Sequence, residues 1–297
     1  MAGTKEIKDH INSVQETKKI TNAMYLIAST KLRRARQELD NTRPYFEALR
    51  REIKRIFRTV ESGVVDSPYF YPEQGEPPLD KPSACLVITA DKGLAGAYNQ
   101  NAIKEALKLL DTHPDTKLYV VGEYGRRFFA SHNIPIEHSF LYTAQNPTMA
   151  RAREISALLL DRYDHGELQK IFLVYTDMEN AASFQARSTR LLPFHRTHFS
   201  VEAEEPITES FEFLPDPRAV LDSMMPSYVS GFIYSALIDS FCCEQNARMA
   251  AMDSANQNAE KLLGELSLEF NRVRQSAITQ EITEVSAGAR AQKSVRR

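Results

Sequence analysis

The N-terminal part of the chain carries a long helical repeat of apolar and small residues, from Lys5 to about Val60. The repeat advances in steps of three, four and seven, without Gly and with Pro44 as its one proline. Its positions are Ile7, Ile11, Val14, Thr21, Met24, Ala28, Leu32, Ala35 and Leu39. This pattern predicts one helix roughly 80 Å long at about 1.5 Å per residue.

A second helical pattern occupies the C-terminal part. Asp216-Pro217 predicts an N-cap followed by proline at the first helical position, and Pro226 predicts a kink or a restart. Small and apolar residues then recur every three or four positions at Ala247, Ala251, Ala255, Ala259, Leu262, Leu266, Phe270, Val273 and Ala277. We expect a helix from about Pro226 to Gln292, roughly 100 Å long.

The middle of the chain alternates between strand and helix patterns. The apolar run 84–89 is typical of a strand that is buried on both faces. Further strands are predicted over 117–121, 170–175 and, at an edge, 185–192; helices are predicted over 101–110, 124–132 and 149–163. Strands separated by helices imply a mainly parallel sheet.

Composition divides these patterns into five segments. They are an N-terminal helix (1–60), a Pro/Gly-rich linker (61–82), a Rossmann-like α/β domain (83–200), an acidic loop (201–216) and a C-terminal helix (217–297). The two long helices cannot bury their apolar stripes on one small domain. We therefore expect an α/β fold in which they pack on each other as a long antiparallel coiled coil.

Overall composition excludes several protein classes. The 37 basic and 39 acidic residues leave a net charge of −2, which argues against a globally basic nucleic-acid binder. Apolar residues make up 42% of the chain, which argues against disorder. The three cysteines form no disulfide framework, and no apolar stretch of about 18 residues predicts a membrane span. The charged N-terminus resembles neither a signal peptide nor a transit peptide.

One loop, Asp91 to Asn99, occupies the place of a phosphate loop, between a strand and a helix. It lacks both Gly-Lys-Ser/Thr and Gly-x-Gly-x-x-Gly. A tight turn in which Gly93 and Gly96 supply positive φ is the plainer interpretation. The seven scattered histidines show no metal-ligand spacing, and no catalytic set of side chains stands out.

The first 60 residues are basic, with 14 basic and 7 acidic side chains. Lys31, Arg33 and Arg34 are at the centre of this charge. They form either a solvated helix face or an electrostatic collar for an acidic partner. At the other end, apolar residues in 278–289 continue beyond the length of the N-terminal helix. We expect this end to project as a single helix whose apolar side meets another protein.

Five motifs together resemble the gamma-subunit family of F-type ATP synthases. They are Ile11–Met24, Lys31–Ala35, Asp91–Asn99, Glu244–Met249 and the C-terminal signature Ile278–Ala289. The resemblance covers nearly the whole chain and implies a bacterial central rotor shaft. Such a shaft turns inside a ring of alpha and beta subunits, is not itself catalytic, and needs no metal or cofactor.

The resemblance also implies partners and contact residues. The partners are three alpha and three beta subunits, epsilon and the membrane c-ring, with one copy of this chain per complex and no nucleic acid. Membrane association occurs only through the complex, at the cytoplasmic face of the plasma membrane. The implied contacts with the beta catch loops are Met24, Arg248, Gln275, Thr279 and Glu281. Lys31, Arg33 and Arg34 form the basic band, and Phe211 and Phe213 belong to the foot that meets epsilon or the c-ring.

Two alternatives stand beside this interpretation. An independent α/β enzyme would use the 91–99 loop for a phosphate cofactor and would bind nucleotide by itself. A coiled-coil scaffold with a basic arm would bind nucleic acid or an acidic partner with strong salt dependence. Neither explains the motif at Ile278–Ala289.

Overall fold

The computed structural model describes residues 3–59, 67–71, 80–141, 143–178, 184–195, 199 and 213–295. The chain forms two compact units: Met1–Ala28 with Met249–Arg297, called unit 1, and Ser29–Arg248, called unit 2. The division falls inside both long helices, α1 (Thr4–Thr59) and α5 (Pro217–Val295). The two long helices that the sequence pattern predicts are therefore confirmed.

The core of unit 2 is a five-stranded sheet in the order β3-β2-β1-β4-β5. The strands are β1 (Ser83–Ile88), β2 (Thr116–Val121), β3 (His138–Phe140), β4 (Lys170–Met178) and β5 (Phe184–Leu192). The first four are parallel, and β5 is antiparallel to β4 at the edge. The predicted mainly parallel sheet is therefore confirmed. Strand β3 is an addition: its three residues are too few to show a periodic pattern.

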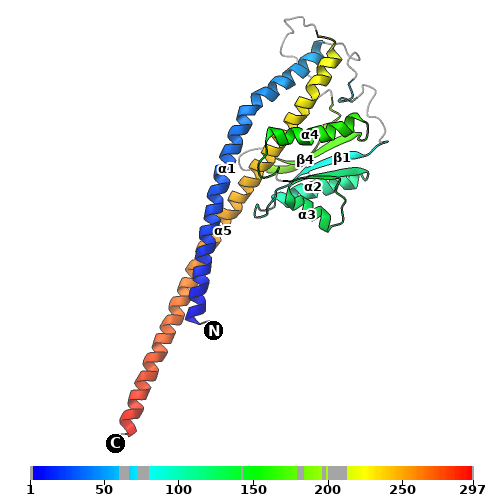
Figure 1. Cartoon of the computed structure of the whole chain (residues 1–297). Helices are drawn as coiled ribbons and strands as arrows, with labels where there is room; N and C mark the ends of the chain where they lie inside the picture. The colour runs from blue at the N-terminus through cyan, green and yellow to red at the C-terminus, as the bar shows by residue number, and fades with distance from the viewer. Residues whose placement is uncertain are drawn as a thin grey trace. The chain divides into compact units, whose positions relative to one another are not determined.

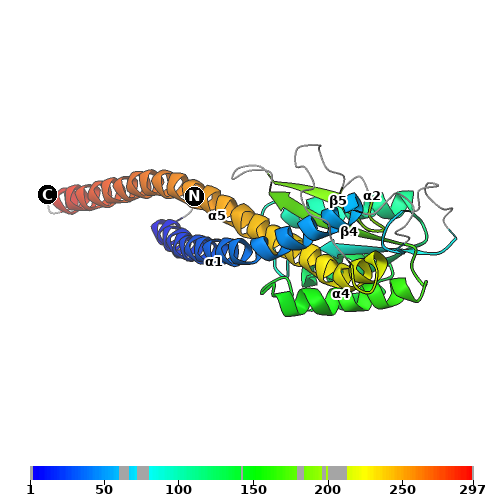
Figure 2. The ribbon, with the colours of Figure 1, turned by 90° about the horizontal axis from the view of Figure 1, so that it is seen from above.

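Helices cover both faces of this sheet. Helix α4 (Met149–Asp164) lies on one face, and α2 (Tyr98–Thr112) and α3 (Glu123–Ser131) lie on the other (Figure 1). Figure 2 shows α4 and α2 on opposite sides of the sheet from a second direction. All six residues of β1 are buried, because both faces of the strand are covered.

Helix α5 is a core element of unit 2 before it enters unit 1. Its buried residues recur at every fourth position: Leu221, Met225, Val229, Ile233 and Leu237. Ser230 hydrogen-bonds Ser156 of α4 at 2.6 Å, and the Ser240 hydroxyl accepts the amide of Thr176 on β4 at 3.1 Å. This part of α5 thus contacts the α/β domain as well as α1, whose Phe46 lies at Gly231. The expectation that the long helices pack only on each other is corrected to this extent.

The start of α5 follows the predicted cap, but the predicted restart at Pro226 does not occur. Asp216 caps the helix, since its Oδ1 accepts the amide of Ala219 at 2.9 Å. The helix is continuous through Pro226, so the predicted restart is wrong.

In unit 1, the first part of α1 and the last part of α5 form the predicted antiparallel pair, side by side in Figure 1. Lys18 contacts Glu260 at 2.7 Å, and Thr21 hydrogen-bonds Asn256. In these two contacts the residue number rises along α1 and falls along α5, so the helices run antiparallel. Ile7, Met252 and Leu266 are buried in this pair.

Part of the predicted linker packs into unit 2. Tyr69, Phe70 and Tyr71 are buried, and the Phe70 ring lies 4.7 Å from Phe57 at the C-terminal end of α1. This aromatic contact holds the end of α1 against the domain. Most of the expected acidic loop, 201–212, lies outside the described residues. Among the helices that the structure describes, none has an apolar stretch long enough to cross a membrane.

Candidate functional site

The sheet order creates a topological switch point at the carboxyl ends of β1 and β4. The chain leaves β1 for β2 on one side and reaches β4 on the other, and doubly wound folds bind ligands in the crevice at such a point. Thr89, Ala90 and Asp91 follow β1 at this place. The crevice is therefore the first candidate site in unit 2.

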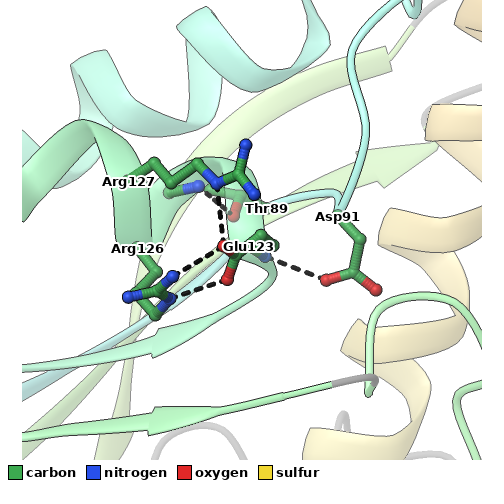
Figure 3. A network of polar contacts seen from close by, with 6 residues as sticks. Thr89, Asp91, Glu123, Arg126 and Arg127 are labelled. Carbon is green, nitrogen blue, oxygen red and sulfur yellow. Dashed lines mark hydrogen bonds and ion pairs between the residues drawn. The ribbon is translucent and has the colours of Figure 1, made fainter.

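The N-terminal amides of α3 beside this crevice are all bound within the chain. Asp91 Oδ1 accepts the amide of Glu123 at 2.9 Å, the Ala90 carbonyl accepts that of Tyr124 at 3.0 Å, and Thr89 Oγ1 accepts that of Gly125 at 3.1 Å. Figure 3 shows Asp91 joined to Glu123, with Thr89 close to both. These amides therefore do not offer an anion site.

Glu123 itself is an ion-pair centre at the start of α3. It accepts two 2.6 Å hydrogen bonds from Arg126 and one of 2.8 Å from Arg127 (Figure 3). The hydrogen bonds from Arg126 and then Arg127 lower the pKa of Glu123 to about 2. Its charge also complements the positive end of the helix.

A glycine lies in the turn between β2 and α3. Gly122 has φ +98°, and a Cβ there would lie 2.2 Å from the Thr89 carbonyl oxygen. The β2–α3 turn therefore lies directly against the backbone after β1, and a larger residue would force the two apart.

The 91–99 loop is shaped by the buried side chain of Asn99. Its Oδ1 accepts the amide of Ala90 at 2.9 Å, and its Nδ2 donates to the Lys92 carbonyl at 3.4 Å. Gly96 has the expected positive φ, +54°. The expectation for Gly93 is wrong: Leu94 takes the second left-handed position, with φ +63° and a side chain 65% exposed. A left-handed leucine is strained and must be held by its surroundings.

Helix α5 fills the crevice with its own side chains. Cys243 and Ala247 pack on Ala90, Ala95 and the buried Tyr98. Beside them, Glu244 is 6% exposed and Arg248 is 9% exposed. The place where a doubly wound fold binds its ligand is thus occupied by the chain itself.

Glu244 and Arg248 form a buried ion pair that reaches the loop. Arg248 Nη1 donates to Glu244 Oε1 at 2.6 Å, and Arg248 Nη2 donates to the Gly93 carbonyl at 3.0 Å. Burial raises the pKa of Glu244, and Arg248 opposes that rise. Arg248 is thus largely buried in this chain, and its expected contact with a beta subunit stays a prediction. The missed partner, Glu244, had a signal in the sequence: an acid four residues before a base on a helix.

The cysteines are buried as well. Burial raises the pKa of Cys85 and of Cys242 to about 12, and raises that of Cys243 further above its ordinary value. These thiols remain protonated near neutral pH. Among the residues that the structure describes, no group of His, Cys, Asp and Glu could hold a metal ion.

The basic band lies on α1 within unit 2. Lys31, Arg33 and Arg34 are exposed, and Arg34 pairs with Glu38 at 3.2 Å. Between them and after them, Leu32 and Ala35 are buried. The band is thus the solvent face of an amphipathic helix.

The remaining residues expected to contact the beta subunits lie in unit 1. Met24 is half-buried on α1, while Gln275, Thr279 and Glu281 are exposed on α5. Thr279 donates to the Gln275 carbonyl one turn earlier at 2.9 Å. Of the foot residues, Phe213 is half-buried, and Phe211 lies outside the described residues.

Burial on α5 stops beyond the residues that face the start of α1. The pairs Lys18–Glu260 and Thr21–Asn256 put the start of α1, Thr4, opposite about residue 273. Val273 is half-buried, and every residue from Arg274 to Gly288 is exposed. Among them, Ile278, Ile282 and Val285 are 44%, 61% and 73% exposed. This segment, 274–288, is a single helix with apolar side chains in solvent.

Comparisons with known proteins indicate a family. The family model described as "ATP synthase" matches residues 3–292. The ATP synthase gamma chain of Caldanaerobacter subterraneus is 40% identical over 97% of this chain and 99% of its own length; that of Acetivibrio thermocellus is 37% identical over 99% and 100%. A chain of the Euglena gracilis mitochondrial ATP synthase has a TM-score of 0.67, covers 99% of this chain with 96% of its own, and is 14% identical. That last likeness shows the fold.

Proposed function

This chain belongs to the ATP synthase gamma-chain family, and from that premise we propose that it is the rotating central stalk of an F-type ATP synthase. The subunit is not catalytic itself. It turns inside a ring of three alpha and three beta subunits and couples ion flow through a membrane c-ring to ATP synthesis or hydrolysis on beta. The filled crevice at β1 and β4 supports a mechanical role over nucleotide binding.

The observation that carries the proposal is the bare 274–288 segment. A single helix in water does not keep a row of exposed isoleucine and valine side chains without a partner surface. An encircling ring of subunits supplies such a surface on all sides of one helix. Ile278, Ile282 and Val285 are spaced four and three residues apart, so they share one face of the helix, and a subunit of the ring would cover that face.

We assign the contacts with the beta subunits to Met24, Gln275, Thr279 and Glu281. The three α5 residues lie on or next to the apolar segment and are exposed. Glu281 can accept charge-assisted hydrogen bonds that break and form again as the shaft turns. The exposed Lys31, Arg33 and Arg34 offer a positive surface to acidic loops of the ring.

The other partners follow from the same assignment. Phe211 and Phe213 lie in the part of the chain that we assign to the foot, which rests on epsilon and the c-ring. One copy acts per complex. The complex works at the cytoplasmic face of a bacterial plasma membrane, and this chain is peripheral to it.

The test is assembly with cognate alpha and beta subunits, read by native mass spectrometry and ATPase activity. We expect one copy of this chain with three of each partner. A chain that ends at Val273 should lose most of the stability of this complex, because it lacks the apolar segment. Failure of the full chain to assemble with its cognate subunits would overturn the proposal.

A matched pair of substitutions tests the assigned contacts. Glu281→Gln should slow ATP hydrolysis about tenfold, the expected size for one charge-assisted hydrogen bond. Glu269→Gln removes an exposed carboxylate from the paired part of the same helix and should leave the rate within twofold. Equal effects of the two would count against the assignment of Glu281.

A further inference from the structure

We propose that Arg248 is a positioning residue: together with Glu244 it ties the 91–99 loop to α5, so that the α/β domain and this helix turn as one body. The tie itself is a property of unit 2 alone. Its mechanical consequence rests on the proposed rotor function.

The geometry of the tie joins two segments far apart in the sequence. The guanidinium of Arg248 reaches Glu244 with one nitrogen, at 2.6 Å, and the carbonyl of Gly93 with another, at 3.0 Å. Both charged side chains are about nine-tenths buried. A planar guanidinium can hold two acceptors at fixed angles, which an ammonium group cannot do in the same way.

Stability alone does not explain a buried pair at this place. Removing two charges from water is costly, and a buried ion pair is often no better than a well-packed apolar pair. Asp91 adds a second negative charge near Glu244, and this charge also raises the pKa of Glu244. An apolar pair would fill the space but would leave the Gly93 carbonyl without this donor. The pair therefore serves to fix the position of the loop.

The loop needs such a restraint because its backbone is strained. Leu94 and Gly96 both have positive φ, and the exposed Leu94 side chain makes little packing of its own. Asn99 holds the loop from inside, through Ala90 and Lys92. Arg248 holds it from α5, at the residue next to Leu94.

The tie lies at a mechanically important position on α5. Arg248 is the last residue of α5 that belongs to unit 2. A turning moment that passes along this helix leaves or enters the α/β domain at this residue. A tie at this position limits twisting of α5 against the α/β domain.

The tie can be tested on the isolated full-length chain by hydrogen exchange. In Arg248→Met, amides of the 91–99 loop should exchange at least tenfold faster than in the unsubstituted chain, while those of β1 keep their protection. Arg248→Lys should give an intermediate rate, because it keeps the charge and loses the two-pronged geometry. Unchanged exchange in the loop would overturn the tie.

A matched control uses a surface ion pair near the start of α5, between an arginine and an aspartate. Arg218 lies 3.5 Å from Asp222, four residues on, but is 57% exposed. Arg218→Met removes a pair of the same spacing from the surface and should leave loop exchange unchanged. A faster loop in this variant would mean that any loss of an α5 ion pair loosens the domain, and would overturn the specific role of Arg248.

The mechanical consequence is tested in the assembled complex in sealed vesicles. Arg248→Met should lower the number of ions pumped per ATP hydrolysed at least twofold, and Arg218→Met should not. If Arg248→Met loosens the loop but leaves the number of ions pumped per ATP unchanged, the proposal that torque passes through the tie is overturned. If the unsubstituted chain does not assemble, the rotor function fails, while the exchange experiment still decides the tie.

Discussion

The ring of Phe46 on α1 lies against the backbone of α5 at Gly231. A Cβ at Gly231 would come within 2.0 Å of two ring carbons, so only glycine allows this approach. Both residues belong to unit 2, where Ser230 next to Gly231 also bonds α4. The glycine therefore sets the distance between the two long helices inside the domain.

Gly231→Ala should destabilise unit 2. Alanine gains up to about 1 kcal/mol of helix propensity over glycine, but overlap with the Phe46 ring costs about 1–3 kcal/mol. We expect a net loss of about 1–2 kcal/mol, measured by urea denaturation. Gly264→Ala is the control, because nothing lies within 4 Å of its Cβ position. It should stabilise the chain by about 0.5–1 kcal/mol, and equal signs for the two would contradict the packing described for Phe46.

Asp91→Ala should weaken the start of α3. The substitution removes the Oδ1 that accepts the Glu123 amide at 2.9 Å, and loss of such a cap costs about 0.5–2 kcal/mol. Asp91→Asn keeps an acceptor of the same length and should cost less than half as much. Denaturation midpoints of the two variants measure the difference. A larger loss for asparagine would indicate that the charge, and not the hydrogen bond, supports α3.

Asp239 on α5 should make the stability of unit 2 fall as pH rises. Burial, and next the charge of Asp177 on β4, raise the pKa of Asp239 from 3.8 to about 6. Ser235 on the same helix and Arg43 on α1 oppose the shift. Between about pH 4 and pH 6, the folded chain holds a proton that the unfolded chain has released. The free energy of unfolding therefore decreases across this window.

Asp239→Asn tests this pH dependence, because asparagine resembles the protonated acid at every pH. Its advantage over the unsubstituted chain should rise from near zero at pH 4 to roughly 1–2 kcal/mol above pH 6, after allowance for partial exposure. Urea denaturation from pH 4 to pH 8 gives the curve. A constant difference across this range would show that Asp239 does not titrate there.

The three cysteines should be unreactive in the folded chain. Their buried thiols have raised pKa values, so the reactive thiolate is scarce at pH 8. Ellman's reagent should react slowly with the native chain and should titrate three thiols in denaturant. Rapid labelling of one thiol in the native chain would identify a local opening of α5 or β1.

Local patterns in the sequence are enough to locate most elements. The repeat from Ile7 to Leu39 predicts α1, and the apolar run at 84–89 predicts a strand with two covered faces. Such patterns lie in consecutive residues, and the helix or strand period is read directly from them. Strand β3 was not predicted, because its three residues, His138, Ser139 and Phe140, are too few to show a period.

The family motifs also located candidate contacts, and the structure places them differently. Glu281 and Thr279 stand in solvent, as a contact surface requires. Arg248, from an equally specific motif, is buried against Gly93. A motif names a residue that matters in a family, while burial depends on what folds against it.

The sequence by itself determined the two long helices, the alternation of strands and helices between them, and the apolar C-terminal end that lacks a partner helix. Only the tertiary structure decided that α5 fills the switch point with Glu244 and Arg248, that Phe46 lies on Gly231, and that Leu94 takes a left-handed backbone. The physical reason is distance along the chain. Periodicity is a property of neighbours, whereas these contacts join segments separated by more than 100 residues, and packing selects them after the elements have formed.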